Sequence, residues 1–313
     1  MSGASKNSVT WAEIDENAAE QRIDNFLVKT LKGVPRSHIY RLLRNGEVRV
    51  NSGRVAPTYR LQTGDKLRIP PVRTAQVSMR APAIGPRLKA EVIFEDEYLL
   101  VLDKPAGIAV HGGSGVSRGV IEQIRLERPQ LKFIELVHRL DRETSGLLLL
   151  AKKRTALLGL HTAMREGAVE KRYLALTSGA WRNARQNVRL PLKRYLTASG
   201  ERRVAVVEDG QTTHTVFTLE RGWRDFSLLN AELKTGRTHQ IRVHLAHLGF
   251  PIAGDDKYGD FALNRQLAKC GLKRMFLHAA SLVVKHPLTG ALLNLNAPLP
   301  QELSAFLQTL DDR

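Results

Sequence analysis

The wholly apolar run Leu147–Ala151 constrains the fold of this chain more than any other short stretch. Five residues are far too few to span a bilayer, so the run predicts a strand inside a folded core. Many strand-like stretches with few intervening helices predict an α+β fold with a mainly antiparallel sheet. The other expected strands are 91–96, 98–105, 172–176, 214–220 and 226–234, and the expected helices are 155–166 and 239–249.

The positive charge of the chain is concentrated near its N-terminal end. Lys and Arg number 48 against 31 acidic residues, which gives a net charge of +17, and residues 21–90 alone contribute +12. A basic excess of this size indicates a polyanionic partner, most often nucleic acid, although membrane surfaces also attract basic proteins. The asymmetry predicts a separate binding module in this segment.

Cysteine usage and the first twenty residues bear on the compartment. Cys270 is the single cysteine, which excludes an intramolecular disulfide and a cysteine-based zinc site. The first twenty residues are polar and mixed in charge, unlike a secretory signal. We therefore expect a cytoplasmic protein with no membrane partner.

Residues 21–70 have the pattern of a small α/β module. Apolar residues at helical spacing predict one helix from Ile23 to Leu31 and a second that begins near Ser37, the expected N-cap, and ends at Asn45-Gly46. Short strands are expected around 48–50 and 67–69. Basic residues on or near the second helix are candidate RNA contacts, with a solvated helix face as the alternative: Arg36, Arg41, Arg44, Arg49 and Arg54.

This module resembles an S4 domain. The matching stretches are RIDNFLVKTLKGVPRSHIYRLLRNGEVRVNSGRV and LQTGDKLRIP. The resemblance implies binding to structured RNA, which is read by shape and phosphate rather than by base edges. Around the module we expect a disordered segment at 1–20, a Pro-rich linker at 71–89 and a second domain at 90–313.

Several kinds of chemistry compete for the second domain. HGGSG at 111–115 is similar to the oxyanion loop of lipases, but the chain has no Gly-x-Ser-x-Gly, so a Gly-rich turn near a substrate is favoured. His239, His244 and His247 share one expected helix without His-Glu-x-x-His, which favours packed or solvated histidines over zinc. The glycines between 107 and 115 match no nucleotide fingerprint. A binding protein without catalysis also fits the charge.

Asp141, in HRLDRETSGLLLLAK at 138–152, is the strongest candidate for a reactive group. Arg139 and Arg142 flank it, and a carboxylate between cations keeps a depressed pKa and stays ionised. Its loop precedes a buried strand, so we expect it at the edge of a cleft on a rigid support. Such a carboxylate can attack a sugar carbon, although a structural Arg–Asp pair is the alternative for a lone aspartate.

Three further segments join this motif in a resemblance to the pseudouridine synthases of the RluA type. They are LDKPAGIAVHGG (102–113), VEKRYLAL (169–176) and LKTGRTHQIRVHLAHLGFPIAGDDKYG (233–259). The resemblance implies a catalytic domain with a mainly antiparallel mixed sheet and a central cleft. It also implies a reaction that isomerises uridine in RNA to pseudouridine.

The resemblance assigns roles to five residues. Asp141 is the implied nucleophile, and Tyr173 is implied to pack against the target base and to remove its proton. Arg242 is implied to pair with the catalytic carboxylate. Arg139 is implied to fill the space left by a flipped uridine, and Ile241 to line the pocket.

Two basic residues and two carboxylates in the same motifs have less definite expectations. Lys104 and Arg237 are candidates for phosphate contacts, with a surface charge as the alternative. Asp255 and Asp256 are expected to brace a loop rather than to catalyse.

The implied reaction breaks and remakes bonds within one nucleotide, so it needs no redox step, no energy input, no cofactor and no metal. The implied partner is RNA, in particular 23S ribosomal RNA of the large subunit, and a monomer is favoured. The alternative is a non-catalytic RNA-binding factor of ribosome assembly. The complete set of Asp141, Tyr173 and Arg242 favours the enzyme.

Overall fold

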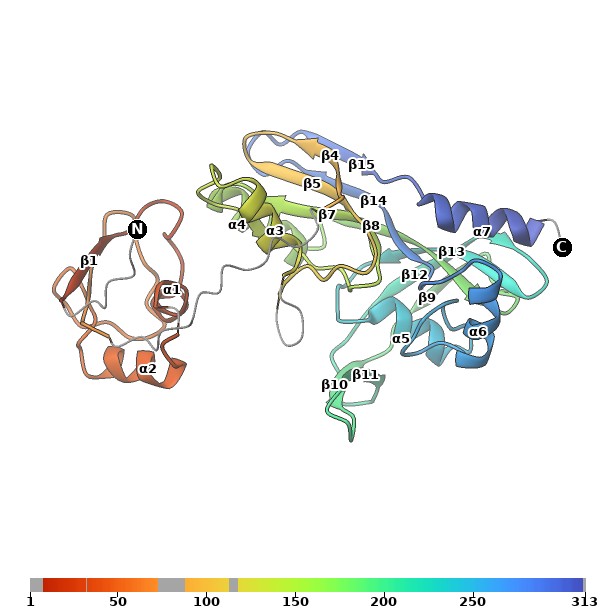
Figure 1. The fold of residues 1–313 in the computed structure, drawn as a ribbon, viewed down its shortest axis with the longest axis horizontal. Coiled ribbons are helices and arrows are strands. Elements are labelled where there is room, and N and C mark those ends of the chain that lie inside the picture. Colours follow the sequence, from red (N-terminus) through yellow and green to blue (C-terminus); the bar gives the residue numbers. More distant parts are fainter. Residues whose placement is uncertain (1–7, 32, 73–87, 113–117, 312–313) are drawn as a thin grey trace. The chain divides into compact units, whose positions relative to one another are not determined.

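The computed structural model describes residues 8–311, apart from residue 32 and the stretches 73–87 and 113–117. The chain forms two compact units, Met1–Arg87 and Leu88–Arg313, and each has its own apolar core (Figure 1). Among the described residues, no helix has both the length and the apolar character needed to cross a membrane.

The N-terminal unit packs two helices against a small sheet. The helices are α1 (Ile23–Thr30) and α2 (Arg36–Arg44). The strands are β1 (Thr10–Glu13), β2 (Arg49–Val50) and β3 (Lys66–Ile69), in the order β1-β3-β2 with antiparallel pairing. The apolar faces of both helices pack with the sheet in one core, which includes Ile23, Leu27, Ile39, Leu42 and Leu67. The expected α/β module is confirmed.

Two local expectations for this unit are wrong. Residues 10–13 were expected to be disordered, but they form β1, which pairs with β3 and is followed by the buried Ile14. Ser37 was expected to be the N-cap of α2, but the helix begins at Arg36 after Pro35, whose fixed φ favours this start, so Ser37 lies in the first turn. Residues 1–7, and most of the expected linker at 71–89, lie outside the described residues.

The C-terminal unit is built on a large mixed sheet. In its described part, β7 and β14 are parallel neighbours and the other strand pairs are antiparallel, so the expected mainly antiparallel sheet is confirmed. β6 (Glu135–Leu136) pairs with β7, and β15 (Leu292–Asn296) pairs with β14. The remaining strands lie in the order β4 (Glu91–Glu95), β5 (Leu99–Lys104), β7 (Ser145–Ala151), β14 (Leu277–Lys285), β8 (Glu170–Ser178), β13 (Phe226–Leu233), β12 (Thr215–Gly222) and β9 (Arg185–Val188).

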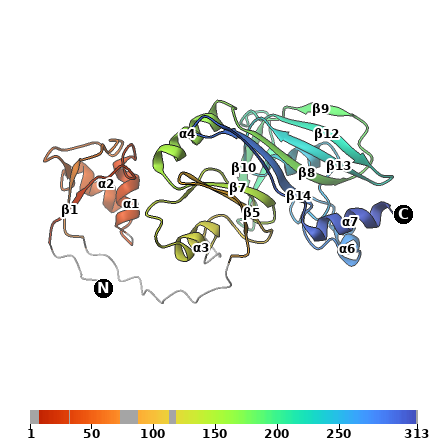
Figure 2. The same cartoon turned by 90° about the horizontal axis from the view of Figure 1, so that it is seen from above.

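Two helices explain why β7 is buried along its whole length. α3 (Val120–Glu127) and α4 (Arg154–Arg165) lie on opposite sides of β5 and β7 (Figure 2). Leu148 and Leu150 of β7 pack in the core that α3 joins, whereas Leu147 and Leu149 pack in the core that α4 joins. A strand covered on both faces has no solvent side and therefore reads as a continuous apolar run.

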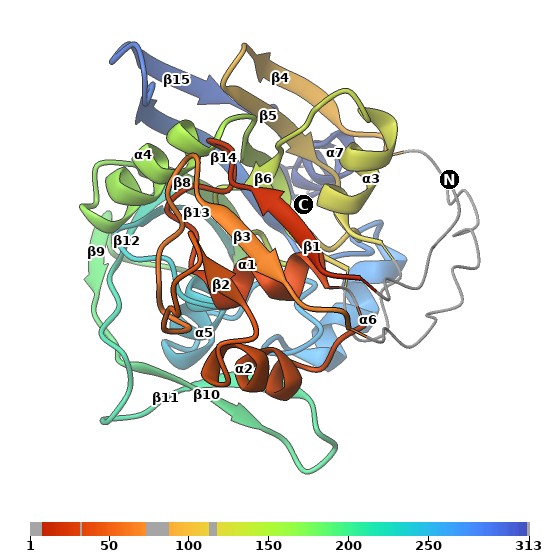
Figure 3. The ribbon, with the colours of Figure 1, turned by 90° about the vertical axis from the view of Figure 1, so that its left-hand side faces the viewer.

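Three more helices and a hairpin complete this unit. α5 (Gln240–His247) contributes to the main core, while α6 (Phe261–Lys269) and α7 (Gln301–Asp311) share a smaller core. β10 (Leu192–Leu196) and β11 (Arg202–Val206) form a hairpin that projects from the main sheet (Figures 1 and 3). Leu192 and Val204 anchor its base against Val243 of α5.

Candidate active site

A cleft of about 550 Å³ opens in the C-terminal unit, where the loop before β7 meets β8, the end of β13 and the start of α5. Its walls bring together residues as far apart in the sequence as Val137 and Leu277. Six of the seven residues assigned to catalysis or substrate binding line this cleft: Arg139, Asp141, Tyr173, Arg237, Ile241 and Arg242. Their roles remain predictions, but their common location is a property of the structure.

The loop that carries Asp141 is fixed by the strand pair behind it. The Thr144 amide donates to the Asp141 carbonyl (3.2 Å), and β7 begins one residue later. Gly146 has a φ of 106°, and a Cβ at this position would lie 2.3 Å from the Ala279 carbonyl oxygen. Only glycine permits this approach of β7 to β14. The approach sets the start of β14, where Leu277 also lines the cleft, beside Asp141.

Arg242 joins two carboxylates at the base of the cleft. Its Nη1 donates to Asp141 Oδ2 (3.1 Å), and its Nε and Nη2 donate to the two oxygens of Asp255 (2.7 Å each). The residue is 3% exposed. Burial alone would lower the pKa of Arg242, but the hydrogen bonds and charge of Asp255, with the charge of Asp141, raise it above its ordinary value. The guanidinium is therefore permanently charged and rigidly oriented.

Asp255 was expected to brace a loop, and it does so by accepting hydrogen bonds from the amides of Lys257 (2.8 Å) and Tyr258 (3.1 Å). Burial would raise the pKa of Asp255, but its hydrogen bonds with Arg242 outweigh burial and lower it. Sequence reasoning missed this second task of holding Arg242. The available signal was chemical, because a buried arginine that gives one edge to Asp141 needs another anion for its remaining donors.

The two arginines that flank Asp141 in the sequence, Arg139 and Arg142, do not hold it. Arg142 Nε donates to Glu143 Oε1 (2.8 Å), and Arg139 lines the cleft wall. Within the described residues, the arginine that hydrogen-bonds Asp141 is Arg242, which lies 101 positions away. The expectation that flanking cations hold this carboxylate is therefore wrong, because Arg142 pairs with Glu143 instead and no hydrogen bond joins Arg139 to Asp141 among the described residues.

Tyr173 lies on β8 opposite Ala231 of β13 and Ala279 of β14. The small neighbours leave room beside the ring, which forms part of the cleft wall although the residue is only 7% exposed. Burial, and then the charge of Asp141, raises the pKa of Tyr173 well above its ordinary value. The phenol is therefore neutral in the free protein near neutral pH.

Lys104 does not reach the cleft, so the expected phosphate contact is wrong. Its side chain is fully buried, and its Nζ donates to the carbonyl oxygens of Pro105 (2.7 Å), Ile108 (2.9 Å) and Arg142 (3.1 Å). Burial lowers the pKa of Lys104 to about 7, while three carbonyl acceptors match the three hydrogens of an ammonium group. Lys104 therefore ties two loops together, one of which carries Asp141.

The three histidines of the expected helix have different surroundings. His244 is buried and contacts Thr213 Oγ1 (2.7 Å), and His247 is exposed, so the expectation of packed or solvated residues is confirmed for both. His239 differs, because it lies in the cleft with Nε2 3.7 Å from Asp141 Oδ2. No group of three potential metal ligands occurs among the described residues.

His239 also links the cleft to the β10–β11 hairpin. Its Nδ1 lies 2.8 Å from Tyr258 Oη, which accepts a hydrogen bond from the Val204 amide of β11 (3.0 Å). Its φ of 53° is left-handed and costly for a residue with a side chain. Burial lowers the pKa of His239 and outweighs the opposing effect of the Asp141 charge, so the ring beside Asp141 is neutral near pH 7.

The arginines predicted to bind RNA in the N-terminal unit all have exposed side chains. Arg41 and Arg44 line a hollow on α2 together with Ser37 and His38. Arg49 also has a structural contact, since its Nε donates to the Gly46 carbonyl (3.1 Å). Of the glycine-rich stretch 111–115, residues 113–115 lie outside the described part of the chain.

Comparisons with known proteins agree with this arrangement. Residues 98–247 match the model of the RNA pseudouridylate synthase family, and residues 21–67 match that of the S4 domain. The chain is 50% identical over 311 residues to ribosomal large subunit pseudouridine synthase C of Pasteurella multocida (strain Pm70), covering 98% of this chain and 95% of the relative. The protein of the same name from Escherichia coli (strain K12) is 50% identical over 311 residues, covering 97% of each chain.

A solved structure shows the same fold. Human RNA pseudouridylate synthase domain containing 4 matches with a TM-score of 0.57 and 25% identity, covering 70% of this chain and 92% of that one. Fold, cleft and relatives together define an RNA-modifying isomerase. The chain belongs to the RNA pseudouridine synthase family, and an N-terminal S4 domain precedes its catalytic domain.

Proposed function

We propose that this enzyme converts specific uridines of large-subunit (23S) ribosomal RNA to pseudouridine, in the cytoplasm and without a cofactor. The proposal is supported by similarity over nearly the whole chain to relatives named for the large ribosomal subunit. The exposed arginines of the S4 domain and the net charge of +17 suit a highly charged, structured RNA.

The row Asp141–Arg242–Asp255 is the observation that supports the catalytic part of the proposal most strongly. Arg242 fixes Asp141 through Oδ2, and Asp255 holds Arg242 through two parallel hydrogen bonds. The other oxygen of Asp141, Oδ1, has no hydrogen-bond partner among the described residues. A charged carboxylate with one oxygen anchored and one oxygen free is suited to attack a nucleotide in the cleft.

The target uridine must leave its stack to reach this cleft, which costs a few kcal/mol. We propose that Arg139 fills the space that the uridine leaves, and that the base lies against Tyr173 and Ile241 on the wall of the cleft. Asp141 then attacks the nucleotide, and the bond between N1 of the base and C1′ of the sugar breaks. The uracil rotates and its carbon 5 forms the new bond to C1′, while the bond that Asp141 formed breaks and returns the free carboxylate.

Proton transfers complete the isomerisation. Carbon 5 loses a proton and N1 gains one, so the product has the composition of the substrate. We propose that Tyr173 takes the proton from carbon 5. Because its pKa is raised, Tyr173 enters the reaction as a neutral phenol, so its own proton must pass to N1 as it takes the proton from carbon 5.

The decisive experiment is chemical mapping of pseudouridine in total RNA from cells with and without this chain. We expect a small set of positions in 23S RNA to lose the modification and to regain it with the wild-type chain but not with Asp141→Asn. Asp225→Asn is the matched control, because Asp225 is an exposed aspartate in the β12–β13 turn and should restore all positions. Unchanged maps after removal of the chain would contradict the proposal and favour a non-catalytic factor.

A further inference from the structure

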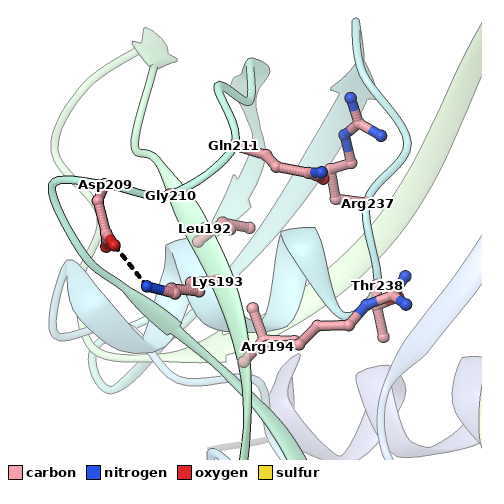
Figure 4. A pocket seen from close by; sticks show the side chains of 9 residues that line it. Leu192, Lys193, Arg194, Asp209, Gly210, Gln211, Arg237 and Thr238 are labelled. Atoms are coloured by element: carbon pink, nitrogen blue, oxygen red, sulfur yellow. Dashed lines mark hydrogen bonds and ion pairs between the residues drawn. The ribbon is translucent and has the colours of Figure 1, made fainter.

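We infer that a second pocket beside the active cleft is a subsite for the nucleotide that adjoins the target uridine in the RNA strand. This inference rests on the proposed function. The pocket has a volume of about 460 Å³ and lies between the start of β10, the turn at 209–211 and the loop before α5 (Figure 4). Its polar lining includes Lys193, Arg194, Gln211, Arg237 and Thr238.

The pocket is continuous with the active cleft. Arg194, Arg237 and Thr238 line both cavities. The two arginines come from different elements, since Arg194 lies on β10 and Arg237 on the loop before α5, and Figure 4 shows both side chains at this pocket. A strand whose uridine occupies the cleft therefore has its neighbouring nucleotide at this pocket.

The charges of the pocket suit a phosphate group. Arg194 Nη2 donates to Thr238 Oγ1 (2.6 Å), and the other donors of Arg194 have no partner within the described residues. The guanidinium of Arg237 likewise has none in that part of the chain, and both residues are exposed. The one lining carboxylate, Asp209, is paired with Lys193. Two guanidinium groups thus keep free donors among the described residues, and their planar forks match phosphate oxygens.

Gln211 supplies a group that can distinguish bases. Its backbone is fixed by two hydrogen bonds with Leu192, from Leu192 N to Gln211 O and from Gln211 N to Leu192 O (2.9 Å each). Gly210 permits this close packing, because a Cβ there would lie 2.6 Å from the Leu192 nitrogen. The side-chain amide has no partner among the described residues, and it offers one donor face and one acceptor to an unstacked base.

The pocket wall is also tied to the catalytic carboxylate. Val204 of β11 packs with Leu192 and Val243, and its amide donates to Tyr258 Oη, which contacts His239 beside Asp141. The hairpin that carries Arg194 is therefore held in a fixed position relative to the cleft. A neighbouring nucleotide bound here would place its uridine in a defined register.

The test uses a ribosomal RNA fragment that contains a uridine shown to be modified, with the full-length enzyme. Arg194→Ala should raise KM about tenfold, as expected for one lost charged hydrogen bond, and change kcat by less than about twofold. The slope of log affinity against log salt should fall by about one. Arg224→Ala is the control, since it removes the same charge from the β12–β13 turn, about 25 Å along β13 from the cleft.

Neutral methylphosphonate linkages then locate the contact. Two fragments are compared, each with a single neutral linkage on one side of the target uridine. One of the two linkages should raise KM for the wild-type enzyme. The same linkage should cause no further rise in KM for Arg194→Ala. Gln211→Leu, which keeps size and removes both polar atoms, should alter the ratio of rates among fragments that differ in the base next to the target.

The outcomes separate this inference from the proposed function. The subsite would be overturned if the rise in KM from Arg194→Ala were fully additive with the rise from each neutral linkage. It would also be overturned if Gln211→Leu left the ratio of rates among the fragments unchanged. A wild-type enzyme that forms no pseudouridine in any ribosomal RNA would instead overturn the proposed function.

Discussion

Asp141 and Arg242, 101 positions apart in the sequence, meet at 3.1 Å between Oδ2 and Nη1 in the cleft of the catalytic domain. The pair is not an isolated salt bridge, because Asp255 holds the opposite edge of the same guanidinium. The direction of the Asp141 side chain is thus set by a residue that is itself immobile. Three of the five predictions that follow test this row or the cleft residue Tyr173.

Asp141→Asn keeps the size of the side chain and removes its charge. We expect no detectable turnover with purified RNA and nearly unchanged binding, because phosphate contacts supply most of the affinity. Turnover and filter binding measured on the same preparation check this. Substantial activity of the Asn variant would refute the role of Asp141 as nucleophile.

Asp255→Asn should destabilise the protein, because it leaves the buried Arg242 without its full counter-charge. Loss of one partner of a buried ion pair costs about 3–5 kcal/mol, which urea unfolding can measure, and kcat should fall as Arg242 loses its orientation. The matched control is Asp256→Asn at the next position, whose side chain is 60% exposed and lies 3.5 Å from Arg242. Its effect should stay below about 1 kcal/mol, and equal effects of the two variants would contradict the prediction.

Tyr173→Phe keeps the ring that lines the cleft and removes the hydroxyl. We expect kcat to fall by about 10² or more with little change in KM, since general-base catalysis is lost while packing remains. Tyr98→Phe is the control, because Tyr98 contacts His286 through its ring and does not line the cleft. Near wild-type kcat for Tyr173→Phe would leave Tyr173 with a packing role alone.

His244 should make the stability of the enzyme sensitive to mild acid. Burial lowers the pKa of His244 to about 4, against 6.5 for an ordinary histidine. Between these values the unfolded chain binds a proton that the folded chain does not, so the contribution is complete above pH 6.5 and is lost as the pH falls toward 4. The loss amounts to about 3 kcal/mol at most.

Replacement by glutamine tests this assignment. Thr213 Oγ1 donates to the Leu190 carbonyl (2.6 Å), so His244 Nε2 must carry the hydrogen that Thr213 accepts. A glutamine amide can donate in the same way and does not titrate. The free energy of unfolding of His244→Gln, measured from pH 4 to pH 7, should therefore change less than that of the wild-type chain, and parallel curves would show that another group is responsible.

Removal of residues 1–87 should leave a folded and catalytically competent C-terminal unit, since each unit has its own core. Binding to a ribosomal RNA fragment should weaken, and its salt dependence should become shallower, because residues 21–90 carry a net charge of +12. The full-length chain with Arg36, Arg41, Arg44 and Arg49 all changed to Ala should show the same direction of change. An unchanged slope in both would mean that these arginines do not contact phosphate.

The sequence was most informative where a local pattern decides the structure. β7 was predictable because it contains the continuous apolar run Leu147–Ala151, and α5 because its apolar spacing ends at a glycine. β14 was missed because its stretch LHAASLVVK has neither a clean alternation nor a continuous apolar run. The hairpin β10–β11 was missed because its strands mix basic and apolar residues and are partly exposed, and they fold through anchoring contacts with α5 rather than through their own burial.

In the candidate site, too, local motifs were predictable and tertiary positions were not. The motifs pointed to Asp141, Tyr173 and Arg242, and the structure places them in one cleft. No local pattern distinguishes a buried lysine from an exposed one at the end of a strand, so the position of Lys104 was not predictable. Likewise, His239 lies beside Asp141 through a left-handed backbone conformation that residue type does not indicate.

The pairing of β7 with β14 has a consequence for the synthesis of the enzyme. Ser145 and His278, which pair across these strands, are separated by 133 positions. Closing so long a loop is slow and costs chain entropy, so the pairing forms only after most of the polypeptide is available. While the chain is still being translated, Asp141 has been made, but Arg242, Asp255 and β14 follow it only later. We therefore expect a nascent chain that lacks these residues to be inactive, and activity to begin with the completed tertiary fold.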